Sequence, residues 1–277
     1  MRHSNGGMNF DKFLRSVGPL VAAAAVGGIM AAARKNGNFD FKWDGSDCGF
    51  ANGFGAGFGG KAGVPLAELD MSGDSPSELV LAGADHLVVS EGEDFTISVQ
   101  GDEDAKESLR FRLEDGALHV ASSNSSNGGE GIATVNVTMP APSKVTIAGA
   151  GQIAVSALAD DAEVRVAGAG QISVLDLKCS ALNVTIAGAG RFTTGGEAKA
   201  LSLSVAGSGR AEMSGLLVEE ADIDLAGAGS AIFGCDGDVN ADIMGSGNVT
   251  VRGSARCRVQ SMGAGYLVCE PRDDKPA

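Results

Sequence analysis

A Gly-small-Gly triplet recurs seven times in the second half of this chain at an almost constant interval. From the first glycine of one triplet to the first glycine of the next, the steps are 19, 20, 19, 20, 18 and 18 residues. The glycines are Gly149, Gly151, Gly168, Gly170, Gly188, Gly190, Gly207, Gly209, Gly227, Gly229, Gly245, Gly247, Gly263 and Gly265. A fixed period of this kind is typical of stacked architectures. It favours a scaffold or a binding surface over a catalytic pocket.

Each triplet lies between two short segments in which apolar and polar residues alternate. Residues 184–187 are Val-Thr-Ile-Ala before one triplet, and residues 171–174 are Gln-Ile-Ser-Val after another. Alternation with β-branched residues predicts half-buried strands. The residues after the second strand are polar or small, as in 195–198 and 234–238. One unit is therefore predicted as strand, glycine corner, strand and loop.

Stacking of these units predicts the fold. Two strands of about four residues cannot bury an apolar face alone, whereas several stacked coils can. The sequence predicts an all-β, right-handed parallel β-helix with coils of 18–20 residues, each about 4.8 Å above the last. Glycine suits the corners because it reaches unusual backbone angles and because stacked backbones leave no room for a Cβ atom.

The chain before the repeats divides into three parts. Residues 1–35 have a basic start and a charge-free stretch, 17–33, which predicts a signal or membrane-anchor segment, with a soluble helical tail as the alternative. Residues 36–63 are rich in Gly and Phe and are predicted to form a flexible linker. The predicted β-helix domain spans 64–269, and its irregular first part is expected to cap the open end of the stack.

Within this irregular part, strands are expected at 95–99, 109–113, 118–121 and 133–139, and residues 82–89 resemble a degenerate repeat. The polar tail 270–277 is expected to be disordered.

Charge and cysteine content exclude several classes of partner. After residue 60 the chain has 15 basic and 31 acidic residues, a net charge of −16. This disfavours nucleic acid and anionic lipid, so we expect membrane contact only through 17–33. The cysteines form no Cys-x-x-Cys pair, and we expect no zinc site, no other metal and no cofactor. We interpret all five as buried small hydrophobes, although Cys257 could pair with either Cys269 or Cys235. The five are Cys48, Cys179, Cys235, Cys257 and Cys269.

One column of residues, directly after each second glycine, is the candidate binding site. Stacked coils would place these residues in one row about 4.8 Å apart. Amide and guanidinium groups in a row can bind carbohydrate or an anion, although such a row can also be a solvated face. The residues are Gln152, Gln171, Arg191, Arg210, Ser230, Asn248 and Tyr266.

A pair of carboxylates is the candidate for catalysis. Asp224 and Asp242 occupy equivalent positions on successive coils, whereas Glu212 lies in another column. Paired carboxylates could perform acid–base chemistry or hold calcium. The only cation in their column is Arg165, three coils from Asp224, so we expect no glycosidase or lyase activity. The histidines His3, His86 and His119 have no triad or metal-ligand spacing and are expected in surface or capping roles.

Three segments together resemble a known family. They are Phe-Thr-Ile-Ser-Val-Gln-Gly-Asp-Glu-Asp at 95–104, Leu-Glu-Asp-Gly-Ala-Leu-His-Val at 113–120, and the repeated Val-x-Ile-Ala-Gly-Ala-Gly blocks. Over residues 79–269 the chain resembles the head GIN domain of putative auto-transporter adhesins. The resemblance implies a β-helix-like fold and a place in the bacterial envelope, and it implies no catalytic residue.

Three hypotheses about function follow. The first is a non-enzymatic envelope protein, exposed in the periplasm or on the outer surface, whose β-helix presents a surface for adhesion or assembly. Its ligand would be a protein or a carbohydrate, with self-association as a further option. The second is a carbohydrate-active β-helix enzyme that uses the stacked carboxylates. The third is a structural cap whose Gly/Phe-rich segment 36–63 binds a partner.

Overall fold

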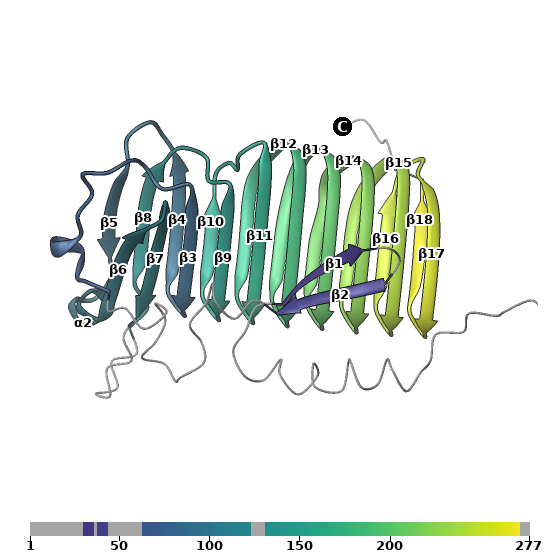
Figure 1. The fold of residues 1–277 in the computed structure, drawn as a ribbon, viewed down its shortest axis with the longest axis horizontal. Coiled ribbons are helices and arrows are strands. Elements are labelled where there is room, and N and C mark those ends of the chain that lie inside the picture. The colour runs from purple at the N-terminus through teal and green to yellow at the C-terminus, as the bar shows by residue number, and fades with distance from the viewer. Residues whose placement is uncertain (1–29, 36–37, 44–62, 123–130, 272–277) are drawn as a thin grey trace, which may run out of the picture.

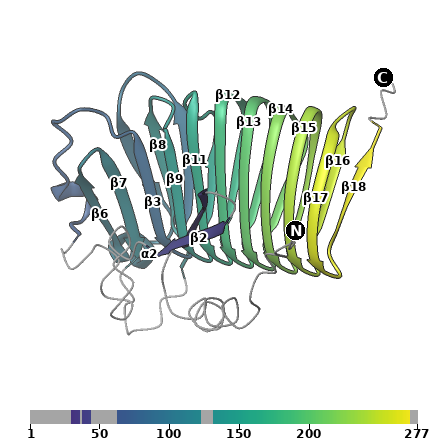
Figure 2. The same ribbon diagram turned by 45° about the vertical axis from the view of Figure 1, so that its right-hand side comes forward.

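The strands of this protein stack side by side along one long axis, as the computed structural model shows from two directions (Figure 1, Figure 2). The structure describes residues 30–35, 38–43, 63–122 and 131–271. The stack is a parallel β-solenoid, as the glycine repeat predicts. Each coil has two faces. The first face contains the strand that follows a glycine corner, and the second face contains the strand that precedes one.

The regular part of the solenoid begins at residue 144. Its strands are β9 (Lys144–Gly149), β10 (Gln152–Val155), β11 (Asp161–Gly168), β12 (Gln171–Gly188), β13 (Arg191–Gly207), β14 (Arg210–Gly227), β15 (Ser230–Gly245), β16 (Asn248–Arg252), β17 (Arg256–Gly263) and β18 (Tyr266–Glu270). The long strands β12 to β15 run through both faces. They pair in parallel, so that Gly188 lies beside Gly168 on one side and beside Gly207 on the other. The spacing of the glycines therefore sets the register of the whole stack.

An irregular cap precedes the regular coils, as expected. It contains η2 (Leu66–Glu68), β3 (Glu78–Gly83), β4 (His86–Glu91), β5 (Thr96–Gln100), α2 (Glu103–Ser108), β6 (Leu109–Glu114), β7 (Ala117–Ser122) and β8 (Thr134–Met139). Strands β3 and β4 form a degenerate coil, in which Gly83 pairs with Gly149 of the first regular coil. Strand β5 is antiparallel to β8 and β6 is antiparallel to β7, so the cap ends in two reversed strands.

The structure differs from the sequence predictions at four places. Residues 195–198 and 234–238 are parts of β13 and β15 instead of loops. In β13 the chain turns sharply at Gly196, which has a φ of 116°, and pairing with β12 resumes beyond the bend after a shift in register. The short helix α2 was not predicted. Residues 30–35 and 38–43 form an antiparallel hairpin, β1 (Met30–Lys35) and β2 (Asn38–Trp43), where the sequence predicted the end of a signal or anchor segment and the start of a linker.

The core is a narrow apolar column enclosed by the two faces. Its second-face wall consists of side chains that are at most 2% exposed, namely Ile147, Val166, Ile186, Val205, Leu225 and Ile243. The first face contributes residues such as Ile153, Ile172 and Phe192, all at most 1% exposed. Burial of each large aliphatic or aromatic side chain contributes about 1.5–3 kcal/mol. The coils are thus held together by repeated burial, and the alternate residues point to solvent.

Candidate functional site

Seven polar residues begin the strands that follow the glycine corners, and they lie in one row along the first face. In register, Gln152 pairs with Gln171, Gln171 with Arg191, Arg191 with Arg210, Arg210 with Ser230, Ser230 with Asn248, and Asn248 with Tyr266. Their side chains point outward because the next residue of each strand points into the core. The structure therefore brings together all seven residues of the candidate site.

The row extends further into the cap than the sequence indicated. His86 pairs with Gln152, and Thr134 pairs with His86. The sequence signal for His86 is the degenerate corner Gly83-Ala84-Asp85, in which an aspartate replaces the second glycine. Thr134 follows no such corner, so no pattern indicated it. We call the nine residues from Thr134 to Tyr266 in this column the polar row.

The polar row is accessible along its whole length. Gln152, Arg191, Arg210 and Tyr266 are exposed, and the other members are partly exposed. Neighbouring strands lie about 4.8 Å apart. A linear ligand that lies along the solenoid axis would therefore meet one polar side chain at every coil.

Positive charge is concentrated at the middle of the polar row. Arg191 Nη1 lies 3.6 Å from Glu212 Oε2, and the two side chains are 44% and 42% exposed. An ion pair this open to solvent contributes little to stability. The guanidinium of Arg210, on the adjacent coil, has no ion pair or hydrogen bond with the part of the chain that the structure describes. Only one of the two adjacent guanidinium groups is thus paired with a carboxylate, which leaves a local positive charge.

The glycine corners hold the strands that carry the polar row. Gly188 has a φ of +114°, and a Cβ atom there would lie 2.6 Å from the carbonyl oxygen of Gly168 in the coil below. The second glycine of a triplet has a different constraint. A Cβ atom at Gly170 would lie 2.7 Å from Cδ1 of the buried Ile147. The first glycine is thus needed for its backbone angle and its close approach, and the second for its close approach alone.

The two candidate catalytic carboxylates lie on the second face, away from the polar row. Asp224 and Asp242 are direct neighbours in register, with Ser204 before them and Gln260 after them. Glu212 belongs to the first face. Among the residues that the structure describes, no group of three or more His, Cys, Asp or Glu could hold a metal ion. The pair therefore lies in a polar column to which its direct neighbours add no further charge.

The histidines occupy different surroundings. His86 belongs to the polar row, whereas His119 lies half-buried in β7 of the cap, opposite Arg112. Burial lowers the pKa of His119, and the charge of Arg112 lowers it further. His3 lies outside the described residues.

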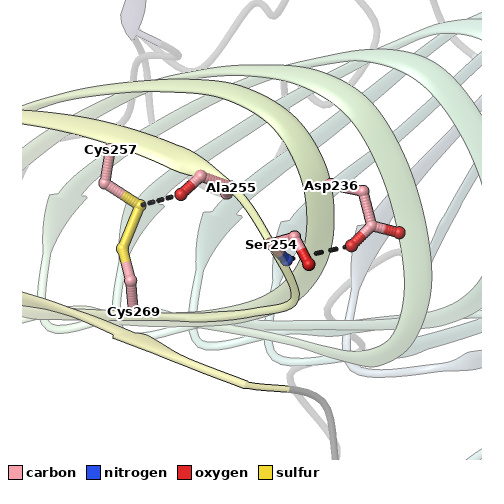
Figure 3. Close-up of a disulfide and its surroundings, with 5 residues drawn as sticks. All are labelled: Asp236, Ser254, Ala255, Cys257 and Cys269. Atoms are coloured by element: carbon pink, nitrogen blue, oxygen red, sulfur yellow. Dashed lines mark hydrogen bonds between the residues drawn. A yellow bond between two sulfur atoms is a disulfide. The ribbon is translucent and has the colours of Figure 1, made fainter.

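A disulfide joins Cys257 of β17 to Cys269 of β18 (Figure 3). The sequence left two pairings open for Cys257, and the interpretation as buried small hydrophobes is wrong for these two residues. It is correct for Cys179 and Cys235, which are free and buried. These two lie in one column three coils apart, about 14 Å, which is too far for a bridge. Cys48 lies outside the described residues.

The surroundings of the two free thiols keep them protonated and therefore unreactive. Burial, followed by the charges of Asp160 and Asp161, raises the pKa of the Cys179 thiol to about 11. Burial also raises the pKa of Cys235. Since the thiolate is the nucleophile, neither residue is a candidate for covalent catalysis at neutral pH.

The parallel solenoid with its glycine corners defines the chain as an all-β repeat protein. Residues 75–255, more than half of the chain, match the model of the family described as "Putative auto-transporter adhesin, head GIN domain". The chain belongs to this family. None of the curated proteins matches the chain. Within the described residues, no helix has the length and apolarity needed to cross a membrane.

Several solved structures share the fold. A putative adhesin from Bacteroides fragilis is 17% identical, with a TM-score of 0.64 over 72% of this chain and 93% of that chain. A putative lipid binding protein from Parabacteroides distasonis is 18% identical, with a TM-score of 0.55 over 70% of this chain and 92% of that one. A putative adhesin from Parabacteroides merdae is 19% identical, with a TM-score of 0.54 over 72% and 92%. At these identities the similarity establishes the fold alone.

Proposed function

We propose that this chain is a non-enzymatic, adhesin-like domain of the bacterial cell envelope that binds an acidic carbohydrate along the polar row. Membership of the adhesin family supports the adhesin-like role. The observation that carries the binding proposal is the pair Arg191 and Arg210 on adjacent coils, of which Arg191 alone forms an ion pair, with Glu212, among the described residues.

The chemistry of the polar row suits sugars. Gln152, Gln171 and Asn248 have both donor and acceptor groups, which match the hydroxyl groups of a sugar ring. Tyr266, at one end of the row, offers an aromatic face and a hydroxyl group. Arginine binds carboxylates through two parallel hydrogen bonds. A chain of sugar rings along the solenoid axis would place successive rings over successive coils.

The charge of the whole protein limits which acidic carbohydrate fits. The chain after residue 60 carries a net charge of −16, which repels a densely charged polymer at long range. A glycan with isolated carboxylates among neutral sugars avoids most of that repulsion. Such a ligand would place a carboxylate over Arg191 and Arg210 and neutral rings over the amides.

The proposal is tested by measuring binding of the full chain to neutral and uronate-containing oligosaccharides. The double substitution Arg191→Gln/Arg210→Gln should weaken binding of the acidic ligand by roughly tenfold or more, since each lost charged hydrogen bond is worth about 1.5–3 kcal/mol before solvent screening. The matched control is Arg165→Gln on the second face. Arg165 also has a single carboxylate partner, with Nη2 2.6 Å from Glu163 Oε1. Equal binding by wild type and the double variant would refute a role for the row.

The alternative of a carbohydrate-active enzyme has little to support it. Inverting and retaining glycosidases need two carboxyl groups on either side of the scissile bond. Asp224 and Asp242 are stacked on one flat column instead. Turnover of a polysaccharide that disappears in Asp224→Asn/Asp242→Asn would revive this alternative.

The cell envelope is the proposed location. A structural disulfide persists in oxidising compartments such as the periplasm and the cell surface, and Cys257–Cys269 fits such a place. The segment 17–33 that would direct export lies outside the described residues, as does most of the Gly/Phe-rich segment that could bind a partner. Mass spectrometry of the native N-terminus, with the redox state of Cys257 and Cys269, checks the location.

A further inference from the structure

The C-terminal end of the solenoid is open. Among the described residues, β17 pairs only with β15 and β18 pairs only with β16, so each strand has one backbone edge without a partner strand. The core is uncovered there as well. Val259 stacks on Ala241, yet Val259 is 48% exposed and Ala241 is 3% exposed. Met262 and Tyr266 add exposed apolar surface at 49% and 55%.

The opposite end has one free edge on the same face. Strand β5 pairs only with β8 in the described part of the chain, whereas the edge of β6 is bridged by Val64 at Phe111. The first face therefore ends in β5 at one end and in β18 at the other (Figure 1). Both strands are five residues long. Because β5 runs against the direction of the coils, a coaxial second copy would bring its β5 antiparallel to β18.

Apolar side chains match across such a junction. Ile97 and Val99 of β5 are partly buried and pack against the core of the cap. Leu267 of β18 is partly buried and packs against the core of the last coils. When β5 of one copy lies beside β18 of another, these side chains would join the two cores into one.

The two ends have opposite charge. Residues 91–107 contain seven acidic residues and one basic residue, a net charge of −6. Residues 246–271 contain three arginines and one glutamate, a net charge of +2. Contact between two N-terminal ends or between two C-terminal ends would bring like charges together, whereas contact between unlike ends is attractive.

The last coil is also held in shape. The Cys257–Cys269 disulfide ties the two faces together at the open end (Figure 3). Arg256 Nε and Nη2 donate hydrogen bonds to the two carboxylate oxygens of Asp238 in the coil below, at 2.9 and 2.8 Å. An edge fixed in this way is preorganised to pair, since less conformational entropy is lost on binding.

We infer that a second copy of this chain docks end to end, with its β5 edge on the β18 edge of the first. Such a contact joins two different surfaces and does not close on itself, so it generates filaments instead of dimers. The proposal does not depend on carbohydrate binding: the polar row lies along the side of the rod and shares only its last residue, Tyr266, with the β18 edge at the junction.

The experiment measures the mass of the full chain by sedimentation across a range of concentration and salt. We expect mass to grow beyond a dimer with concentration and to fall as salt is raised. At the C-terminal end, Arg252→Glu/Arg258→Glu reverses the net charge from +2 to −2 and should weaken association roughly tenfold or more. At the N-terminal end, Glu93→Lys/Asp94→Lys reduces the net charge from −6 to −2 and should weaken association less. Combining all four changes gives both ends a net charge of −2, so the combination should not restore association. All four residues are exposed, so the fold should tolerate the changes.

The other outcomes overturn the proposal. A wild-type chain that stays monomeric at every concentration would mean that another segment of the chain, or nothing, covers the edge. A mass that saturates at a dimer, sensitive only to the C-terminal changes, would mean a two-fold contact between like ends. Growth that is unchanged in the single-end variants would mean association through another surface.

Discussion

At the N-terminal end of the solenoid, β5 and β6 run antiparallel to their neighbouring strands. Val64 bridges the outer edge of β6, and Leu66 packs against the core there. At the C-terminal end the strands of the last coil run parallel to those of the coil before it, and no cap covers them in the described part of the chain. A disulfide links the two strands of this coil instead. The buried fraction of side chains reflects this difference. Phe111 at the N-terminal end is 1% exposed, whereas Val259 at the C-terminal end is 48% exposed.

This comparison shows that a repeat specifies the middle of a solenoid but not its ends. Every inner coil packs on two neighbours, and the same glycines and β-branched residues serve each time. An end coil has one neighbour, so its unpaired backbone edge and exposed apolar side chains must be covered or stabilised by features outside the repeat. The N-terminal end is stabilised by the packing of the irregular cap, and the C-terminal end is stabilised by the disulfide between Cys257 and Cys269.

The largest expected effect concerns a corner in the middle of the stack. Gly188→Val should destabilise the protein by about 4 kcal/mol or more, because it combines a φ of +114° with a Cβ atom 2.6 Å from the carbonyl oxygen of Gly168. Gly263→Val should cost less although its φ is +130°, because Gly263 lies in the last coil and stacks on a neighbouring coil on one side only. Thermal denaturation measures both. The control is Gly73→Val, where nothing lies within 4 Å, and equal losses at Gly188 and Gly73 would contradict the prediction.

The next effect compares one apolar side chain from each end. Phe111→Ala removes a fully buried ring from the cap and should cost about 3–4 kcal/mol. Leu267→Ala at the open end should cost less than about 1.5 kcal/mol, since this side chain already contacts water. Urea denaturation of the two variants under salt conditions that keep the chain monomeric gives both values. A larger loss at Leu267 would show that the open end is closed in solution.

The disulfide ranks third. Cys257→Ser/Cys269→Ser should lower the free energy of unfolding by about 2–3 kcal/mol, because the bond closes a loop of 12 residues that is otherwise free in the unfolded chain. A reducing agent should lower the melting temperature of the wild type and leave that of the double variant unchanged. If reductant lowers both equally, the effect comes from another part of the protein.

Much of the fold could be predicted because its signal is repeated. Seven triplets in succession fix the period, and the alternation between them fixes which residues point inward. Features that occur once were missed. Helix α2 has only six residues, too few for a helical period to show. The sequence predicts loops at 195–198 and 234–238 because glycine and polar residues usually mark turns. In the structure these residues form bends within the long strands β13 and β15.

The candidate site could also be predicted where its residues follow the repeat, and not elsewhere. Seven members of the polar row follow a complete triplet, so their alignment could be deduced from spacing alone. His86 follows a corner in which Asp85 replaces glycine, and Thr134 follows no corner, so both needed the structure. Whether Cys257 pairs with Cys269 or with Cys235 depends on which residues face each other across the last coil. Sequence separation does not contain that information.

The smallest expected effect is a pH dependence confined to the N-terminal end. Burial, with the charge of Arg112 as the second cause, lowers the pKa of His119, while Glu114 and Glu78 oppose the shift and Lys144 adds to it. The unfolded chain takes up a proton near the ordinary pKa of 6.5, whereas the folded chain resists it. The free energy of unfolding should therefore fall as the pH drops below about 6.5, and level off below the folded-state pKa. His119→Gln should remove this contribution of His119 to the pH dependence. The melting temperature should therefore fall further between pH 7.5 and pH 5.5 in the wild type than in the variant. An identical slope in both proteins would assign the pH dependence to carboxylates instead, and would mean that the cap does not bury His119 in solution.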